Sequence, residues 1–287
     1  MIIDDSDYEK EFIPGNQWWI PAHDATEFGS KLLASFIGKR FSFPKSLYAV
    51  HDVIRFFAAN KPNALIVDFF AGSGTTMHAV NLLNAEDGGH RRCIMVTNNE
   101  VSDAEAKEMS KRGLKPGDEE WEKLGIARYV TWPRTVCSIE GHDVNGNPLK
   151  GNYISSDISM ANGFKANAAF FKLGFLDKNA VALGRQFKEM LPTLWMKAGA
   201  HGACPNIGKT VPEMLILPEN KMAVLVDEKA YMAFSEKLDE HPEIETVFIV
   251  TDSDGGYRDM ISGLDVKESY QLYRDYLDNF RIGAVRR

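Results

Sequence analysis

VDFFAGSGTTMHAV, residues 67–80, joins the end of an apolar run to the start of a helical pattern through a turn with two glycines. The run begins at Ala64 as ALIVDFF and is short, continuous and rich in branched side chains. Such a run is typical of a strand buried on both faces of a parallel sheet. GTTMHAVNLLNAED (74–87) predicts a helix, and RRCIMVTNNE (91–100) predicts a second buried strand. Together these segments form a βαβ unit, whose crossover we expect to be right-handed.

The segments on either side of this unit predict further helices. FPKSLYAVHDVIRFFAAN (43–60) carries Pro44, which suits a first helical turn, and it repeats apolar residues every three or four positions, at Leu47, Val50, Ile54, Phe57 and Ala58. TEFGSKLLASFIG (26–38) predicts a shorter helix, and GDEEWEKLGIARYVTWPRTVCSIEG (117–141) predicts two more. HDVNGNPLKGNY (142–153) is rich in Asn, Gly and Pro, so it predicts a loop.

The remainder of the chain alternates predicted strands and helices. The predicted strands are AAFFKLGFL (168–176), MAVLV (222–226) and TVFIV (246–250), and the predicted helical segments are 178–199, 228–241 and 257–264. This alternation indicates a second, smaller α/β domain. We therefore expect an α/β fold with two domains, residues 1–160 and 165–287.

Composition limits the class of protein. The 287 residues carry a formal charge of −7, whereas a chain that wraps nucleic acid by itself usually presents a basic surface. The three cysteines are far apart and lack CxxC spacing, which predicts neither disulfides nor a zinc site. The sequence has no run of about 18 apolar residues and begins with acidic residues, so we expect a cytoplasmic protein that does not enter membranes.

Three kinds of ligand can be weighed for the glycine turn. A phosphate loop requires a Lys directly after its last glycine, and none follows Gly74. A nicotinamide-dinucleotide turn prefers a third glycine where this chain has Met77. A nucleoside that carries an amino acid remains, since Asp68 at the end of the strand can accept hydrogen bonds from an amine. Glu100 closes the second predicted strand, where an acidic side chain commonly binds ribose hydroxyls.

Three segments, taken in order, resemble a known family. FPKSLY (43–48), DFFAGSGTTMHAVNLLN (68–84) and GGHRRCIMVTNNE (88–100) are similar to motifs X, I and II of β-class amino methyltransferases, most closely the Mod subunits of type III restriction systems. The resemblance implies a Rossmann-like sheet, present in part, that binds S-adenosylmethionine for methyl transfer to N6 of adenine in DNA, or less often N4 of cytosine. By this resemblance the cofactor-binding residues are Lys45, Ser46, Asp68, Phe69, Phe70, Ala71, Gly72, Ser73, Gly74, Thr75, Thr76 and Glu100.

The catalytic motif of that family has no counterpart in this sequence. The motif is a D-P-P-Y tetrapeptide that holds the flipped base, and no two prolines are adjacent here. We therefore expect no catalytic residue in this chain, which would act as the cofactor-binding half of an adenine-specific DNA methyltransferase. The expected partners are DNA, an N-terminal half or second subunit with D-P-P-Y and target recognition, and a restriction subunit. The alternative is a noncatalytic assembly subunit, which the intact turn and Glu100 disfavour.

Several other features have simple structural interpretations. Trp18 and Trp19 are expected to cover an edge of the core, and the spacing of the histidines predicts no metal site. Arg134 in TWPRTV follows two helix-breaking residues and suits either a DNA phosphate contact or a salt bridge at a helix start. TDSDGGYRD (251–259) predicts a turn and a helix cap.

Overall fold

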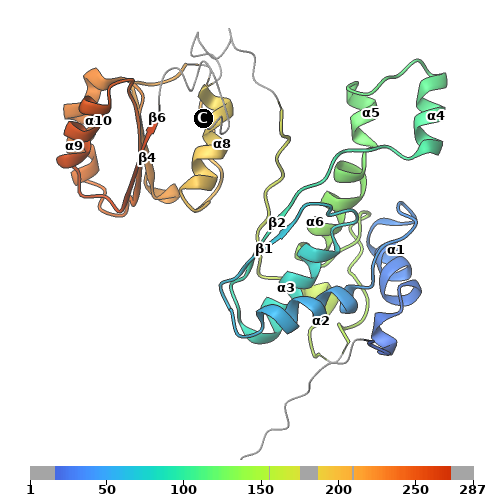
Figure 1. Cartoon of the computed structure of the whole chain (residues 1–287). Helices are drawn as coiled ribbons and strands as arrows, with labels where there is room; N and C mark the ends of the chain where they lie inside the picture. Colours follow the sequence, from blue (N-terminus) through green and yellow to red (C-terminus); the bar gives the residue numbers. More distant parts are fainter. Residues whose placement is uncertain (1–16, 155, 175–186, 209, 273–287) are drawn as a thin grey trace, which may run out of the picture. The chain divides into compact units, whose positions relative to one another are not determined.

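The computed structural model describes residues 17–154, 156–174, 187–208 and 210–272 (Figure 1). The chain divides into two units, Met1–Phe170 and Phe171–Arg287, and each is described by itself. None of the helices in these ranges is long and apolar enough to cross a membrane.

The first unit is built around the predicted βαβ segment. Strand β1 (Leu65–Asp68), helix α3 (Thr75–Asp87) and strand β2 (Arg92–Met95) follow one another, and β1 pairs with β2 in parallel. The other elements are η2 (Pro21–His23), η3 (Thr26–Lys31), α1 (Leu32–Ile37), α2 (Leu47–Ala58), α4 (Asp103–Lys111), α5 (Glu119–Lys123), η4 (Ala127–Thr131), α6 (Trp132–Glu140) and η5 (Met160–Asn162). The helices predicted at 26–38, 43–60, 74–87 and 117–141 are confirmed.

Among the residues that the structure describes, the two-stranded sheet of this unit is covered on one face only. Ile66 and Cys93 pack against the core that helices α2 and α3 help to form. Leu65, Val67 and Ile94 point the other way, because neighbouring side chains in a strand face opposite sides, and each is about half exposed at 49%, 45% and 49%. The prediction that both strands are buried on both faces is therefore wrong.

Helix α2 begins later than predicted, and one of its five predicted core residues is exposed. Its N-cap is Ser46, whose hydroxyl accepts a hydrogen bond from the Ala49 N–H, so Pro44 lies outside the helix. Leu47, Ile54 and Ala58 are buried and Val50 packs against the core, as predicted. Phe57 is exposed, in contrast to the prediction, and Tyr48 and His51 are buried in addition.

Helix α4 was not predicted, because it carries no apolar stripe. Met109 is its buried residue. A local signal was present in the sequence: Ser102 caps the helix by accepting from the Glu105 N–H, and its hydroxyl donates to the Glu105 carboxylate at 2.7 Å. The S-x-x-E spacing is that of a capping box, although here the Glu105 carboxylate accepts from the Ser102 hydroxyl and not from the Ser102 N–H.

The second unit has three layers, and its α/β class is confirmed. Its sheet has the order β3-β4-β5-β6, with β3 antiparallel to β4 and the other pairs parallel. The buried residues of α8 pack on one face of this sheet, and those of α9 and α10 pack on the other (Figure 1). The bounds are α8 (Phe187–Lys197), β3 (Met214–Leu217), η6 (Pro218–Asn220), β4 (Met222–Leu225), η7 (Glu228–Ala230), α9 (Tyr231–Asp239), β5 (Thr246–Val250), α10 (Asp254–Ser262) and β6 (Glu268–Leu272).

The predictions for this unit hold in part. The strands at 222–226 and 246–250 and the helices at 228–241 and 257–264 are confirmed. The strand predicted at 168–176 is wrong for residues 168–174, which have no regular secondary structure, and residues 175–176 lie outside the described ranges. Of the helix predicted at 178–199, the segment 178–186 also lies outside them, and α8 confirms the rest.

Candidate functional site

Asp68 anchors both ends of the glycine turn. One carboxylate oxygen accepts a hydrogen bond from the Phe70 N–H at 3.0 Å, and the other accepts from the Thr76 hydroxyl at 2.6 Å. The Asp68 carbonyl accepts from the Val96 N–H at 2.7 Å, and the Val96 carbonyl accepts from the Ala71 N–H at 3.2 Å. The strand end, the turn and the first turn of α3 are thus tied together around one carboxylate.

The two glycines of the turn are required for different reasons. Both have a left-handed backbone, with φ of +51° at Gly72 and +78° at Gly74. A Cβ on Gly74 would lie 3.2 Å from Cγ2 of Thr131, which is tighter than an ordinary contact, whereas a Cβ on Gly72 would have no neighbour closer than 3.8 Å. Gly74 therefore permits close packing inside the unit, and Gly72 leaves space beside the turn.

The N-terminus of α3 has no side-chain cap. Its N-cap is Gly74, which makes no side-chain hydrogen bond to the helix. The first N–H groups of a helix lack partners within the helix, and the peptide dipoles place a partial positive charge there. This end of α3 is thus suited to an anionic group or to the oxygen atoms of a ligand.

Thr131, at the end of η4, and Arg134, in α6, support the turn from inside the unit. The Thr131 hydroxyl donates to the Gly72 carbonyl at 2.6 Å. Arg134 donates from Nη1 to the hydroxyls of Ser73, at 3.1 Å, and Thr75, at 2.7 Å. Arg134 is 1% exposed. Both sequence-based interpretations of Arg134, a DNA phosphate contact and a salt bridge at a helix start, are therefore wrong. Arg134 lies in the first turn of α6, but its side chain is buried and bonds to hydroxyl groups.

A buried histidine continues this network. Nε of Arg134 donates to Nδ1 of His78 at 3.4 Å, and Nε2 of His78 lies 2.8 Å from the Tyr153 hydroxyl. Burial, and then the Arg134 charge, hold the pKa of His78 well below its usual value. The imidazole is therefore neutral at pH 7, and because Nδ1 accepts, Nε2 carries the proton and donates to Tyr153.

The structure does not join three of the predicted cofactor residues to the turn. Among the described residues, Lys45, Ser46 and Glu100 make no hydrogen bond to residues 68–76. Ser46 is buried and donates to the Ala22 carbonyl at 2.8 Å, so its hydroxyl serves the start of α2. Glu100 is exposed, lies beyond the last strand residue, Met95, and accepts a hydrogen bond from the Asn98 amide. The prediction that Glu100 ends the second strand is wrong, because the paired segment is shorter than the apolar run suggested.

The other predicted site residues lie in the turn or at the start of α3. Asp68, Ala71 and Ser73 are held by hydrogen bonds, and Phe69 and Phe70 are exposed, Phe70 to 91%. Sequence reasoning missed Thr131 as a support of the turn and assigned Arg134 a different role. The sequence shows only a lone charged residue among uncharged neighbours in TWPRTVCS (131–138), which does not reveal that the charge is buried.

The remaining sequence features have mainly structural roles. Trp18 packs against His23 and Phe56, at ring distances of 5.8 and 6.4 Å, but Trp19 is 89% exposed and covers no core edge. Ser253 caps α10 by accepting from the Gly256 N–H at 3.0 Å, which confirms the cap predicted for TDSDGGYRD. Within the described ranges, no group of three or more His, Cys, Asp or Glu side chains could hold a metal ion.

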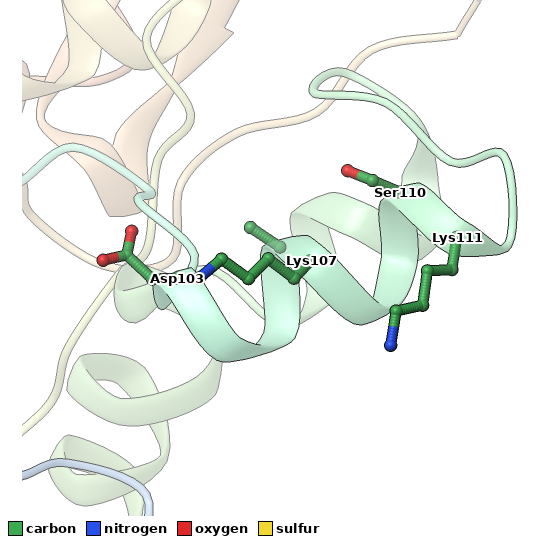
Figure 2. A pocket seen from close by; sticks show the side chains of 5 residues that line it. Asp103, Lys107, Ser110 and Lys111 are labelled. Carbon is green, nitrogen blue, oxygen red and sulfur yellow. The ribbon is translucent and has the colours of Figure 1, made fainter.

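A shallow hollow of about 590 Å³ runs along α4, well away from the turn in sequence. All of its lining residues come from one helix: Asp103, Ala106, Lys107, Ser110 and Lys111 (Figure 2). Both lysines and the aspartate are exposed, so the charges are solvated. A single exposed helix face offers no converging groups that would orient a ligand.

The segment that contains the turn matches a known family model. Residues 5–137 match a family model described as DNA methylase. The chain is 42% identical over 82 residues to the type II methyltransferase M.KpnI of Klebsiella pneumoniae, which is 28% of this chain and 19% of the relative. It is 34% identical over 88 residues to the type III restriction-modification enzyme EcoPI Mod subunit of Escherichia phage P1, which is 31% of this chain and 13% of the relative.

A third relative gives the same result. The StyLTI Mod subunit of Salmonella typhimurium, also of a type III restriction-modification enzyme, is 37% identical over 84 residues, which is 29% of this chain and 13% of the relative. The matched segments thus span less than a fifth of the length of each of these relatives. The resemblance to DNA methylases and to type III Mod subunits is confirmed for this part of the chain.

Proposed function

We propose, from the match of residues 5–137 to the DNA methylase family, that the first unit binds S-adenosylmethionine for a DNA methyltransferase acting on N6 of adenine. The observation that carries the proposal is the glycine turn between Asp68 and the uncapped N-terminus of α3, inside the matched segment. When bound, the cofactor supplies the methyl group. The setting we propose is a restriction-modification system, as in the Mod subunits that the chain resembles.

The residues at the turn fit this cofactor chemically. The Asp68 carboxylate can accept from the cofactor's ammonium group as well as from the Thr76 hydroxyl, because each carboxylate oxygen has two lone pairs. The space beside Gly72 admits a ligand close to the backbone. Glu100 is exposed, so its carboxylate is accessible to accept hydrogen bonds from the ribose hydroxyls. We keep Lys45 and Ser46 as proposed neighbours of the cofactor through their backbone, since the Ser46 hydroxyl is already bonded.

The acceptor base needs residues that this sequence does not contain. No Pro-Pro pair occurs in it, so we propose that another chain segment, in the same or a second subunit, supplies D-P-P-Y and the target-recognition residues. The half-exposed apolar side chains of Leu65, Val67 and Ile94 support a covering segment, since parallel sheets are normally covered on both faces. A restriction subunit is a further proposed partner.

Methyl transfer with radiolabelled cofactor tests this function. We expect residues 1–287 alone to leave unmethylated DNA unlabelled, and an added chain with D-P-P-Y and target recognition to restore labelling. Asp68→Asn should abolish the restored activity. Separation of the labelled nucleosides distinguishes N6-methyladenine from N4-methylcytosine. Strong methylation by the chain alone would contradict the proposed division of labour.

Cofactor binding separates the enzyme from a noncatalytic assembly subunit. We expect titration calorimetry of the chain with S-adenosylhomocysteine to show one site. Gly72→Val should remove that site, because a branched side chain at φ +51° is strained and enters the space beside the turn. No heat of binding with the unsubstituted chain would favour the assembly subunit.

A further inference from the structure

Arg134 is a buried cation without a buried counter-ion. Its side chain donates to Ser73, Thr75 and His78, while its Nη2 is buried and has no hydrogen-bond partner. Across the described ranges, no carboxylate forms an ion pair with it. A buried charge without an opposite charge is costly, so its retention next to the turn calls for a physical reason.

The other buried arginine of the unit shows the usual arrangement. Arg91 donates to both carboxylate oxygens of Asp87, at 2.9 and 2.8 Å, and to the carbonyls of Ala58 and Ala59. It lies next to the C-terminal end of α3, whereas Arg134 lies next to the N-terminal end. One helix thus has a paired arginine at one end and an unpaired arginine at the other.

The groups around Arg134 leave its charge uncompensated. Ser73 and Thr75 are neutral hydroxyls, and the His78 imidazole is neutral at pH 7. The Tyr153 hydroxyl behind His78 is buried, which raises its pKa and keeps it protonated. The positive charge of Arg134 therefore adds to the partial positive charge of the uncapped N-terminus of α3, across a buried medium that screens it weakly.

We propose that Arg134 is a positioning residue that holds Ser73 and Thr75 in place and makes the turn selective for a ligand with a carboxylate. This inference rests on the proposed function, and it assigns the two charges of the cofactor's amino acid part separately. The ammonium group lies toward Asp68, and the carboxylate lies toward the N–H groups that begin α3. Arg134 acts through the turn and does not itself need to touch the cofactor.

The test compares two ligands that differ in the carboxylate alone, S-adenosylmethionine and its decarboxylated form. Titration calorimetry of the full chain should show about tenfold tighter binding of the carboxylate form, the scale of one charge-assisted interaction. Arg134→Gln should lose this preference, because its affinity for the carboxylate form falls more than its affinity for the decarboxylated form. Arg134→Lys keeps the charge and should keep part of the preference. Arg91→Gln is the matched control, which should lower the melting temperature and keep the preference.

Each result decides between the inference and the proposed function. No binding of either ligand by the unsubstituted chain would overturn the proposed function and the inference with it. Binding without a preference for the carboxylate form would overturn the inference alone. So would an unchanged preference in Arg134→Gln, or equal loss of both ligands in that variant with native circular dichroism. If Arg134→Gln does not fold, the preference of the unsubstituted chain and of Arg134→Lys decides the question.

Discussion

Replacement of Gly74 by alanine is expected to loosen the start of α3 more than the same replacement at its other end. Gly74 caps the helix at φ +78°, and Gly88 follows its C-terminus at φ +71°, so alanine pays nearly the same backbone strain at both, about 1 kcal/mol. A Cβ at Gly88 meets nothing within 4 Å, whereas one at Gly74 lies 3.2 Å from Cγ2 of Thr131. Overpacking adds about 1 kcal/mol or more, which gives about 2–3 kcal/mol for Gly74→Ala.

Hydrogen exchange on peptides from residues 75–87 measures this difference within the first unit, even though the chain has two units and need not unfold in one step. We expect Gly74→Ala to reduce the protection of these amides more than Gly88→Ala does. Only Gly74→Ala should also weaken the binding of S-adenosylhomocysteine in calorimetry, because it displaces the N–H groups at the turn. Equal protection and equal binding in the two variants would refute the role assigned to the Thr131 contact.

Three further substitutions and conditions test the site and its support. Glu100→Gln should weaken the binding of S-adenosylhomocysteine by about 1–3 kcal/mol in calorimetry with the fold intact, and no change would place the ribose contact elsewhere. Thr131→Val should lower the free energy of unfolding by about 1 kcal/mol, measured by urea denaturation, because the turn carbonyl loses its hydroxyl donor. Burial opposes protonation of His51, but the carboxylates of Glu86, at 2.8 Å, and of Asp52 outweigh the burial and raise the pKa of His51. Protonated His51 should therefore stabilise the folded state fully below about pH 6.5, and this contribution should be lost as the pH rises through the raised pKa. Urea midpoints measured across this pH range should show the loss, and those of a His51→Gln variant should not.

Local patterns in the sequence predicted the elements that hold the candidate site. The apolar run before Asp68, the glycines and the helical pattern that follows determine a strand, a turn and a helix, because each depends on neighbouring residues and on backbone preferences. The same kind of pattern located the strands of the second unit at 222–226 and 246–250. Helix α4 and strand β6 were not predicted, since α4 lacks an apolar stripe and β6, ESYQL, lacks an apolar run. Strand β3 was also missed, although its apolar run MLIL was present in the sequence.

Only the tertiary structure decided which side chains face the turn and which face solvent. An apolar run looks alike whether one or both of its faces are covered, so the exposure of Val67 and Ile94 could not be read from it. Arg134 is more than fifty positions from Ser73 and Thr75 along the chain, yet its guanidinium bonds to both. Contacts of this kind depend on how α6 packs beside α3, which no local pattern encodes. The sequence by itself thus determined the turn and its glycines, while packing between distant segments determined the buried charge beside it.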